Sequence, residues 1–252
     1  METATWQLSK VTDTEAQVFS AFSKAWNCDG QKVNENSMSR LRKVEIKGQH
    51  YYIKAYKKRG RSLRRYVGRS RIRAEWENLQ RMSQMDIPTL QLVAFGEETR
   101  LLGDRKGILI TRNIPGVIDL EAVAEHKSSI LQQAGWVNHV IGRLSTYVRN
   151  MHDHNFVHGD LKWRNILVST SESTEVYIFD CPQGRQLNGV LLSPLLSRAK
   201  IKDLACLDKV AKYKLTRTQR MRFYLRYAGL DKLNRKHKAR LWKILSFFRG
   251  RE

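Results

Sequence analysis

Three side chains that suit metal-assisted chemistry on a phosphate lie close together in the chain. Asp160 and Asn165 belong to the motif H-G-D-L-K-W-R-N, and Asp180 ends a later apolar run. The apolar segments 166–168 and 176–179 flank a polar stretch, which predicts two short strands joined by a loop. This hairpin would return Asp180 to the side of Asn165. A carboxylate and a carboxamide brought together offer hard oxygen ligands, which suit a magnesium ion bound to nucleotide phosphates.

The segments ahead of this hairpin predict a strand-rich region that contains one helix. Residues 39–46 and 50–56 flank a K-G-Q turn and predict a hairpin whose second strand contains Lys54. Residues 73–82 carry apolar side chains at helical spacing, so we expect a helix with Glu75 on it.

The second half of the chain is predicted to be mainly helical. Two further strands, 90–95 and 107–111, end the strand-rich region, and the turn residues of 113–116 mark a boundary. The predicted helices after it cover 120–125, 136–152, 197–213, 218–228 and 231–248. We therefore expect a first lobe of residues 1–112 and a second lobe of residues 113–252.

This order of elements and motifs resembles the protein-kinase-like superfamily. Within it, the chain looks most like bacterial lipopolysaccharide core kinases of the Kdo/heptose type, which phosphorylate inner-core sugars of lipid A-core. The resemblance covers roughly residues 40–228 and is carried by Lys54, Glu75, the 158–165 motif, and the I-F-D sequence that ends at Asp180. The segments 203–207 and 222–227 also resemble the C-terminal helices of that family.

The resemblance implies an α+β, two-lobed protein-kinase-like fold. Its small N-terminal β-sheet lobe, residues 1–112, would carry one key helix and bind the nucleotide. Its mainly helical C-terminal lobe, residues 113–252, would hold the catalytic groups and the acceptor. Asp203 would then lie on a helix and anchor the backbone of the catalytic loop rather than contact the substrate.

Family precedent also assigns roles to single residues in the first lobe. Lys54 would contact the α- and β-phosphates of ATP and be held by a glutamate on the predicted helix. Glu75 and Glu77 lie two positions apart, about 200° around a helix, so only one of them can face Lys54. We expect that residue to be Glu75.

In the second lobe, the resemblance implies that Asp160 accepts or orients the proton of the acceptor hydroxyl. Asn165 and Asp180 would hold Mg²⁺. Lys162 would lie near the transferring γ-phosphoryl group, where a cation offsets developing charge. His158 would pack under the loop as a structural residue.

The chain departs from the protein-kinase pattern at two places. No glycine-rich loop precedes Lys54, and residues 34–40 occupy its position, where backbone amides and hydroxyls could cover the phosphates. Asp180 is followed by Cys-Pro rather than Phe-Gly, and no A-P-E motif follows. These departures favour a small-molecule or glycolipid acceptor over a peptide.

Charge is the outstanding bulk property. The 252 residues include 46 Lys and Arg against 24 Asp and Glu, a net charge of +22, which argues for an anionic partner. We expect that partner to be the lipopolysaccharide core. The basic segments 54–73 and 235–251 are the candidates for contact with an inner-membrane surface, and the first is expected to be a loop or a partner-facing surface rather than a packed strand. For the C-terminal segment, a helix lying on the membrane and a helix docked on the lobe are equally compatible with its pattern.

The remaining features bound the location of the protein. The three cysteines lack disulfide or metal spacing, and no signal peptide or apolar run long enough to cross a bilayer is present. We expect a cytoplasmic protein. Peripheral attachment to the cytoplasmic face of the inner membrane is the further expectation that the resemblance adds.

The leading hypothesis is therefore an ATP- and Mg²⁺-dependent kinase, a transferase of lipopolysaccharide biosynthesis that phosphorylates a Kdo or heptose hydroxyl. An atypical protein serine/threonine kinase and a small-molecule kinase of the aminoglycoside or choline type stay open as alternatives. A non-catalytic, basic nucleic-acid-binding protein is a third reading, although no nucleic-acid motif is recognisable.

Overall fold

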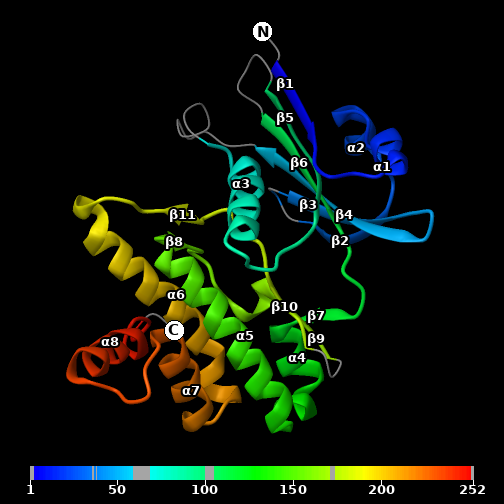
Figure 1. Cartoon of the computed structure of the whole chain (residues 1–252). Helices are drawn as coiled ribbons and strands as arrows, with labels where there is room; N and C mark the ends of the chain where they lie inside the picture. The colour runs from blue at the N-terminus through cyan, green and yellow to red at the C-terminus, as the bar shows by residue number, and fades with distance from the viewer. Residues whose placement is uncertain are drawn as a thin grey trace. The chain divides into compact units, whose positions relative to one another are not determined.

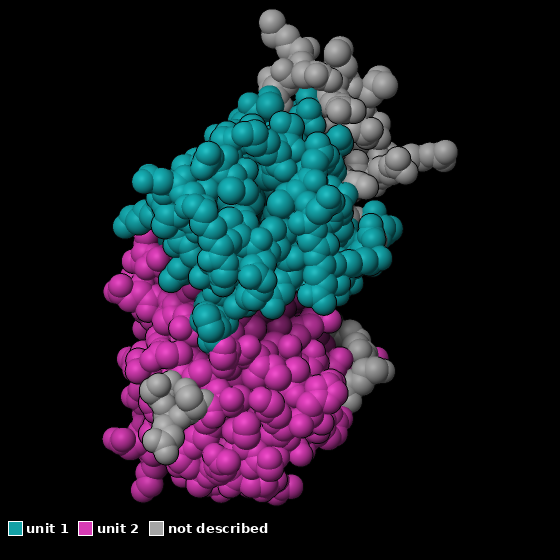
Figure 2. All heavy atoms as spheres, turned by 90° about the vertical axis from the view of Figure 1, so that its right-hand side faces the viewer, with its two compact units in different colours: residues 1–80, 90–115 teal, residues 81–89, 116–252 magenta. Residues whose placement is uncertain are grey.

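The computed structural model describes residues 3–35, 37, 39–58, 69–99, 105–170 and 174–250. The chain forms two compact units (Figures 1 and 2). Unit 1 contains residues 1–80 and 90–115, and unit 2 contains residues 81–89 and 116–252.

An antiparallel sheet forms the centre of unit 1. Its strands are β1 (Thr3–Leu8), β2 (Gln31–Glu35), β3 (Ser39–Ile46), β4 (Gln49–Lys58), β5 (Leu92–Thr99) and β6 (Arg105–Arg112), in the order β1-β5-β6-β4-β3-β2. Lys47 and Gly48, with φ angles of 49° and 80°, form the two-residue turn between β3 and β4. Two successive left-handed residues match the twist of a tight hairpin, so the hairpin predicted from the sequence is confirmed.

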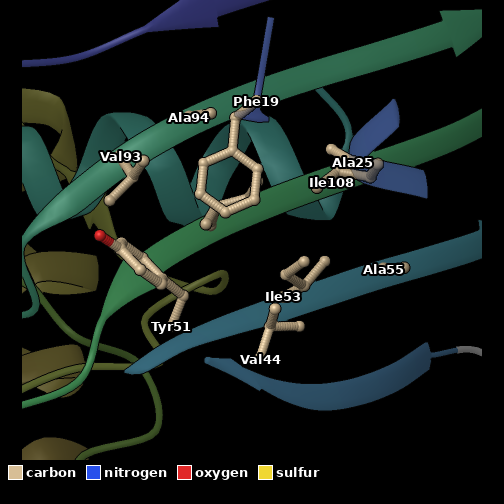
Figure 3. Close-up of a cluster of buried hydrophobic side chains, with 10 residues drawn as sticks. Phe19, Ala25, Val44, Tyr51, Ile53, Ala55, Val93, Ala94 and Ile108 are labelled. Carbon is tan, nitrogen blue, oxygen red and sulfur yellow. The ribbon is translucent and has the colours of Figure 1, made fainter. Parts of the chain in front are cut away.

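The two faces of the sheet are covered by different helices. On β4, Tyr51 and Ile53 belong to a buried cluster with Phe19, which follows α1 (Asp13–Val18), and Ala25 of α2 (Phe22–Asn27), as Figure 3 shows. The alternate residue Lys54 points to the other face, where it bonds to α3 (Arg71–Gln84). Side chains alternate along a strand, so this register puts Lys54 beside the helix.

Several elements of unit 1 were not predicted from the sequence. Strands β1 and β2 and helices α1 and α2 add to the expected hairpin and single helix. Each of these helices has six residues, which is too short to show a helical period. The expectation of a loop or a partner-facing surface rather than a packed strand over 54–73 was wrong at its start, because residues 54–58 belong to β4; residues 71–73 begin α3, and residues 59–68 lie outside the described part.

The second unit is mainly helical. It contains α4 (Leu120–His126), α5 (Ala134–Asp153), α6 (Ser193–Lys214), α7 (Arg217–Ala228) and α8 (Arg235–Leu245), together with the 3₁₀ turns η2 (Ser128–Gln132), η3 (Trp163–Asn165) and η4 (Val190–Leu192). Its short strands form two sheets, one of β10 (Val176–Ile178), β9 (Ile166–Ser169) and β7 (Val117–Asp119), the other of β11 (Arg185–Gln186) and β8 (Phe156–Val157).

Helix α5 follows its predicted pattern closely. The apolar stripe expected on it is buried along its whole length: Trp136, Val140, Leu144, Tyr147, Val148 and Met151. Helix α6 begins at Ser193 rather than 197, with Pro194 in its first turn, where proline is tolerated. Helix α8 begins at Arg235 rather than 231, because the Asn234 side chain accepts from the His237 N–H and caps it. Among the described residues, none of the helices combines the length and the apolar character needed to span a bilayer.

A buried ion pair joins α1 to the sheet. Arg112 donates to both carboxylate oxygens of Glu15, each at 2.6 Å, and the Glu15 side chain is 1% exposed. The same carboxylate accepts from the Thr12 backbone and completes a capping box at the start of α1. The hydrogen bonds from Arg112 are the main cause that lowers the pKa of Glu15 from 4.5 to about 2.

The Glu15 carboxylate should make the stability of the protein depend on acidity. Its folded pKa lies below its unfolded value, so the stabilisation is complete above about pH 4.5 and is lost as the pH falls towards 2. We expect the free energy of unfolding of the wild type, relative to Glu15→Gln, to fall by about 2 kcal/mol between pH 5 and pH 3. Urea unfolding at both pH values measures this difference, and a difference that stays constant with pH would contradict the assignment.

Candidate active site

The β9–β10 hairpin of unit 2 assembles the predicted motif residues. Ile166 pairs with Ile178, and the next backbone contact is a 3.1 Å hydrogen bond from the Phe179 N–H to the Asn165 carbonyl. Asp180 therefore follows directly on the residue that is bonded to Asn165. This part of the expectation is confirmed: the hairpin returns Asp180 beside Asn165.

Asn165 also connects this hairpin to the loop that carries Asp160. Its side-chain Nδ2 donates to the Asp160 carbonyl at 2.9 Å, and the residue is only 3% exposed. Asp160, in turn, forms an ion pair with Lys162, whose Nζ lies 2.7 Å from its Oδ1. The side chains of Asp160 and Lys162 are both partly accessible, so this pair can reach a ligand.

Two residues of the loop region adopt left-handed backbone conformations. Asp180 has φ 54°, which few non-glycine residues adopt and which Asp tolerates better than most. Gly159 has φ 80°, and a Cβ there would lie 2.9 Å from the Gln183 carbonyl. Only glycine fits this position without strain, which explains why glycine precedes Asp160 in the motif.

His158 lies fully buried beneath the loop. Its Nε2 donates to the Phe179 carbonyl at 3.0 Å, and its Nδ1 accepts from the Asp160 N–H at 3.3 Å. Burial lowers the pKa of His158, which favours the neutral ring that this pair of bonds requires. With both ring nitrogens engaged, His158 joins the loop to the end of β10.

Asp203 of α6 holds the same loop from the other side. Its two carboxylate oxygens accept from the backbone N–H groups of His158 at 2.8 Å and Gly159 at 2.9 Å, and the residue is fully buried. The expected role of Asp203 as an anchor of the loop backbone is therefore confirmed. Lys202 adds a further bond, from its Nζ to the Gly159 carbonyl at 2.5 Å.

A chain of hydrogen bonds connects Asp203 to the C-terminal helix. Arg240 of α8 donates to Tyr227 Oη at 3.0 Å, the distance from Tyr227 Oη to His152 Nδ1 is 2.9 Å, and His152 Nε2 lies 3.4 Å from Asp203 Oδ2. The bonds run in one direction if His152 is neutral with its proton on Nε2. Burial lowers the pKa of His152 and raises that of Tyr227 to about 12, so both groups keep the required protonation near neutral pH.

No local sequence pattern predicts this chain of hydrogen bonds, because its members lie on α5, α6, α7 and α8. Helix α8 of the C-terminal segment packs on the same lobe. Helix α8 is docked: Ile244 is buried, the helix packs against α6, and His237 lies 3.1 Å from Tyr224 Oη. Ile244 of the apolar face is therefore packed on the lobe, whereas Trp242 and Leu245 are 63% and 52% exposed.

The Lys54 ammonium in unit 1 has a well-defined carboxylate partner. Its Nζ lies 2.8 and 2.9 Å from the two oxygens of Glu75, which is 2% exposed. Glu77 bonds instead to Arg69 at 2.8 Å. The choice between the two glutamates thus falls on Glu75, as expected.

The donor atoms of unit 2 fit a magnesium ion that is shared with phosphates. Among the described residues, no cluster of three or more His, Cys, Asp and Glu side chains could hold a metal by itself. Mg²⁺ is commonly bound through one or two carboxylates together with waters and substrate phosphates. The Asp180 carboxylate and the Asn165 amide match that donor set.

Comparisons with solved structures define the class of fold. A structure of WaaP in complex with acyl carrier protein has a TM-score of 0.72 and 19% identity, over 96% of this chain and 95% of that one. A structure of the protein kinase Rad53 (residues 1–466) in complex with AMP-PNP has a TM-score of 0.50 and 18% identity, over 85% of this chain and 56% of that one. The α+β, protein-kinase-like fold expected from the sequence is confirmed.

The family follows from the sequence comparison. The model of the Lipopolysaccharide kinase (Kdo/WaaP) family matches residues 24–227, and the chain belongs to that family. It is therefore a kinase of the lipopolysaccharide core, a phosphotransferase with a sugar hydroxyl as acceptor. This favours the leading hypothesis over the protein-kinase, small-molecule-kinase and non-catalytic alternatives. A search of curated proteins finds no match.

The Arg240–Tyr227–His152 chain should affect kcat, because it supports Asp203, which holds the loop ahead of Asp160. Tyr227→Phe keeps the ring but removes the hydroxyl that joins Arg240 to His152. A hydrogen bond of this kind contributes about 0.5–1.5 kcal/mol, so we expect kcat to fall by about 2- to 13-fold with the KM for ATP unchanged.

Tyr224→Phe provides the matched control, because Tyr224 bonds to His237 and takes no part in the chain. Steady-state kinetics with both variants, together with their thermal unfolding curves, separates positioning from loss of folding. An equal fall in kcat for Tyr224→Phe, or none for Tyr227→Phe, would show that the chain does not position the loop.

Proposed function

We propose that the protein transfers the γ-phosphoryl group of ATP to a Kdo or heptose hydroxyl of the lipopolysaccharide inner core, with Mg²⁺ as the cofactor. The observation that carries this proposal is the assembly of Asp160, Asn165 and Asp180 by the β9–β10 hairpin in a member of this kinase family.

Asp160 is the residue that we assign to the acceptor. Its partly exposed carboxylate would accept the proton of the attacking sugar hydroxyl. Lys162, paired with Asp160 at 2.7 Å, would place a cation beside the transferring group and offset its developing charge. Bound Mg²⁺ would neutralise charge on the phosphates, and Asn165 and Asp180 are the residues that would hold it.

Lys54 is the residue that we assign to the α- and β-phosphates. Glu75 holds its ammonium through two bonds on the inner side, and the Lys54 side chain is 22% exposed, so it can still reach a ligand. We accordingly assign nucleotide binding to the lobe of residues 1–112 and the catalytic and acceptor groups to residues 113–252. We also assign the covering of the nucleotide phosphates to residues 34–40, of which Asn36 and Met38 lie outside the described residues.

The charge of the chain supports a membrane-bound, anionic acceptor. The net charge of +22 complements a phosphorylated and carboxylated glycolipid. We propose that the protein works at the cytoplasmic face of the inner membrane as a peripheral protein. The basic segments 54–73 and 235–251 would contribute long-range attraction to that surface.

An apolar cavity of unit 2 favours a second ligand. It has a volume of about 440 Å³, and its walls come from α4, η2, α5, η3, α6, α7 and α8. Trp136, Leu144 and Leu207 are among its apolar lining residues, and Arg217 and Arg220 are among its few polar ones. This volume is within the range of about 300–1,000 Å³ typical of small-molecule pockets.

We propose that this cavity takes a linear acyl chain presented by a carrier protein. The structure of WaaP in complex with acyl carrier protein shows that a protein of similar fold forms such a complex. The apolar walls suit an alkyl chain, and the net charge of +22 favours an anionic donor.

Substitution of the two aspartates tests the phosphotransferase assignment. Asp160→Ala should lower kcat for transfer from labelled ATP to purified core glycolipid by about 10²–10⁴-fold. Asp180→Ala should abolish the magnesium-dependent part of ATP binding, measured by calorimetry. Asp153→Ala, which removes an exposed carboxylate paired with Arg149, is the control and should leave both unchanged. Normal turnover in both site variants would refute the assignment, and mass spectrometry of the product would locate the phosphate on Kdo or heptose.

Filling the cavity tests the acyl-chain proposal. Ala211 lines the cavity on α6, so Ala211→Phe should occupy the space and weaken binding of the fluorescent fatty acid cis-parinaric acid by about tenfold or more. Tyr213→Phe, at an exposed position of the same helix, should bind as the wild type does. Unchanged binding by Ala211→Phe, with a normal unfolding temperature, would place the fatty acid elsewhere.

A further inference from the structure

An exposed group of aliphatic side chains lies between β11 and the body of α6. Val190 and Leu191 of η4 are 90% and 94% exposed, and Leu195 in the first turn of α6 is 54% exposed. We call these three residues the apolar tip; η4 directly precedes α6 in the chain. Contiguous exposed apolar residues mark interaction sites more often than isolated ones do.

The same segment contains a second set of leucines that points inward. Leu187 is buried with Val157 and Ala199, and Leu192 and Leu196 pack against this cluster. These residues provide the local core and fix the path of the chain. The apolar tip is therefore not required for packing, and its exposure follows from a well-anchored turn.

The turn that presents the tip is itself specified by the sequence. Gly189 has φ 101°, a conformation that L side chains rarely adopt, and it directly precedes η4. Strand β11 lies just ahead of this turn in the chain and pairs with β8, and β8 is followed directly by His158. The base of the tip is thus joined by backbone hydrogen bonds to the strand that enters the catalytic loop.

Only cations accompany the tip in the sequence. Residues 181–202 contain four basic side chains, Arg185, Arg198, Lys200 and Lys202, and no acidic one. Arg185 and Arg198 are exposed. An anionic bilayer satisfies both features, because its interior takes the aliphatic side chains and its headgroups take the guanidinium groups.

We infer that the apolar tip inserts into an anionic lipid surface and docks unit 2 on the membrane that carries the acceptor. The inference rests on the family, whose acceptor is a glycolipid, and on the membrane location proposed above, but not on the proposed catalytic roles. A second copy of the chain fits the tip less well, since three side chains offer far less area than the roughly 800 Å² per partner of a stable protein interface. A lipid surface needs no such complementary area.

Vesicle flotation tests the inference without nucleotide or turnover. The wild type should float with vesicles of phosphatidylethanolamine and phosphatidylglycerol, and less with neutral phosphatidylcholine. The double variant Val190→Ser, Leu191→Ser should reduce the partition coefficient by about a hundredfold, because two aliphatic side chains no longer enter the bilayer. Tyr213→Ser, which removes another exposed apolar side chain of unit 2, should change it less than about twofold.

Three further measurements make the result decisive. Unfolding curves should be the same for the double variant and the wild type, since both positions are almost fully exposed. Transfer to deacylated core oligosaccharide should also be unchanged, so failure of the proposed function in the wild type would be seen separately from failure of docking. Equal flotation of double variant and wild type, no flotation of the wild type, or a wild-type dimer that the double variant dissociates would each overturn the inference.

Discussion

The carboxylate of Asp203 is the constraint on which unit 2 depends. It is fully buried and accepts the backbone N–H groups of His158 and Gly159, which fixes the loop directly ahead of Asp160. A buried charge is tolerated only when such partners satisfy it, so the anchor and the loop conformation stabilise each other. The chain through His152 and Tyr227 extends this constraint to the C-terminal helix. The loop geometry is therefore a property of the whole helical unit.

In unit 1, a sheet fixes the position of the Lys54 side chain. Lys54 lies on a strand whose alternate residues are packed against α1 and α2, so its own side chain is directed to α3. Glu75 is buried there and bonds to it twice. In the proposed contact with a phosphate, a cation held in this way would lose little further freedom, which is the physical advantage of building a binding group on a rigid element.

The apolar cavity and the apolar tip suit a lipid-linked substrate better than a free sugar. A kinase that acts on small polar alcohols needs neither an apolar cavity lined by Leu144 and Leu207 nor solvent-exposed side chains such as Val190 and Leu191. The cavity lies between helices, whereas the tip lies on a turn, so the two features suit different apolar ligands. Together with the charge of +22, they are consistent with work at an anionic membrane surface.

Local patterns were enough to predict the β9–β10 hairpin, the apolar stripe of α5, and the spacing of Asp160 and Asn165. Periodicity and turn residues carry that information over short distances. Contacts between residues far apart in the chain could be identified only in the folded structure. The packing of α8 on the lobe and the hydrogen bonds that lead from Arg240 to Asp203 connect helices α5, α6, α7 and α8. Position 159 requires glycine because the Gln183 carbonyl approaches it closely. Such packing between distant segments leaves no periodic pattern in the sequence, so it could not be predicted.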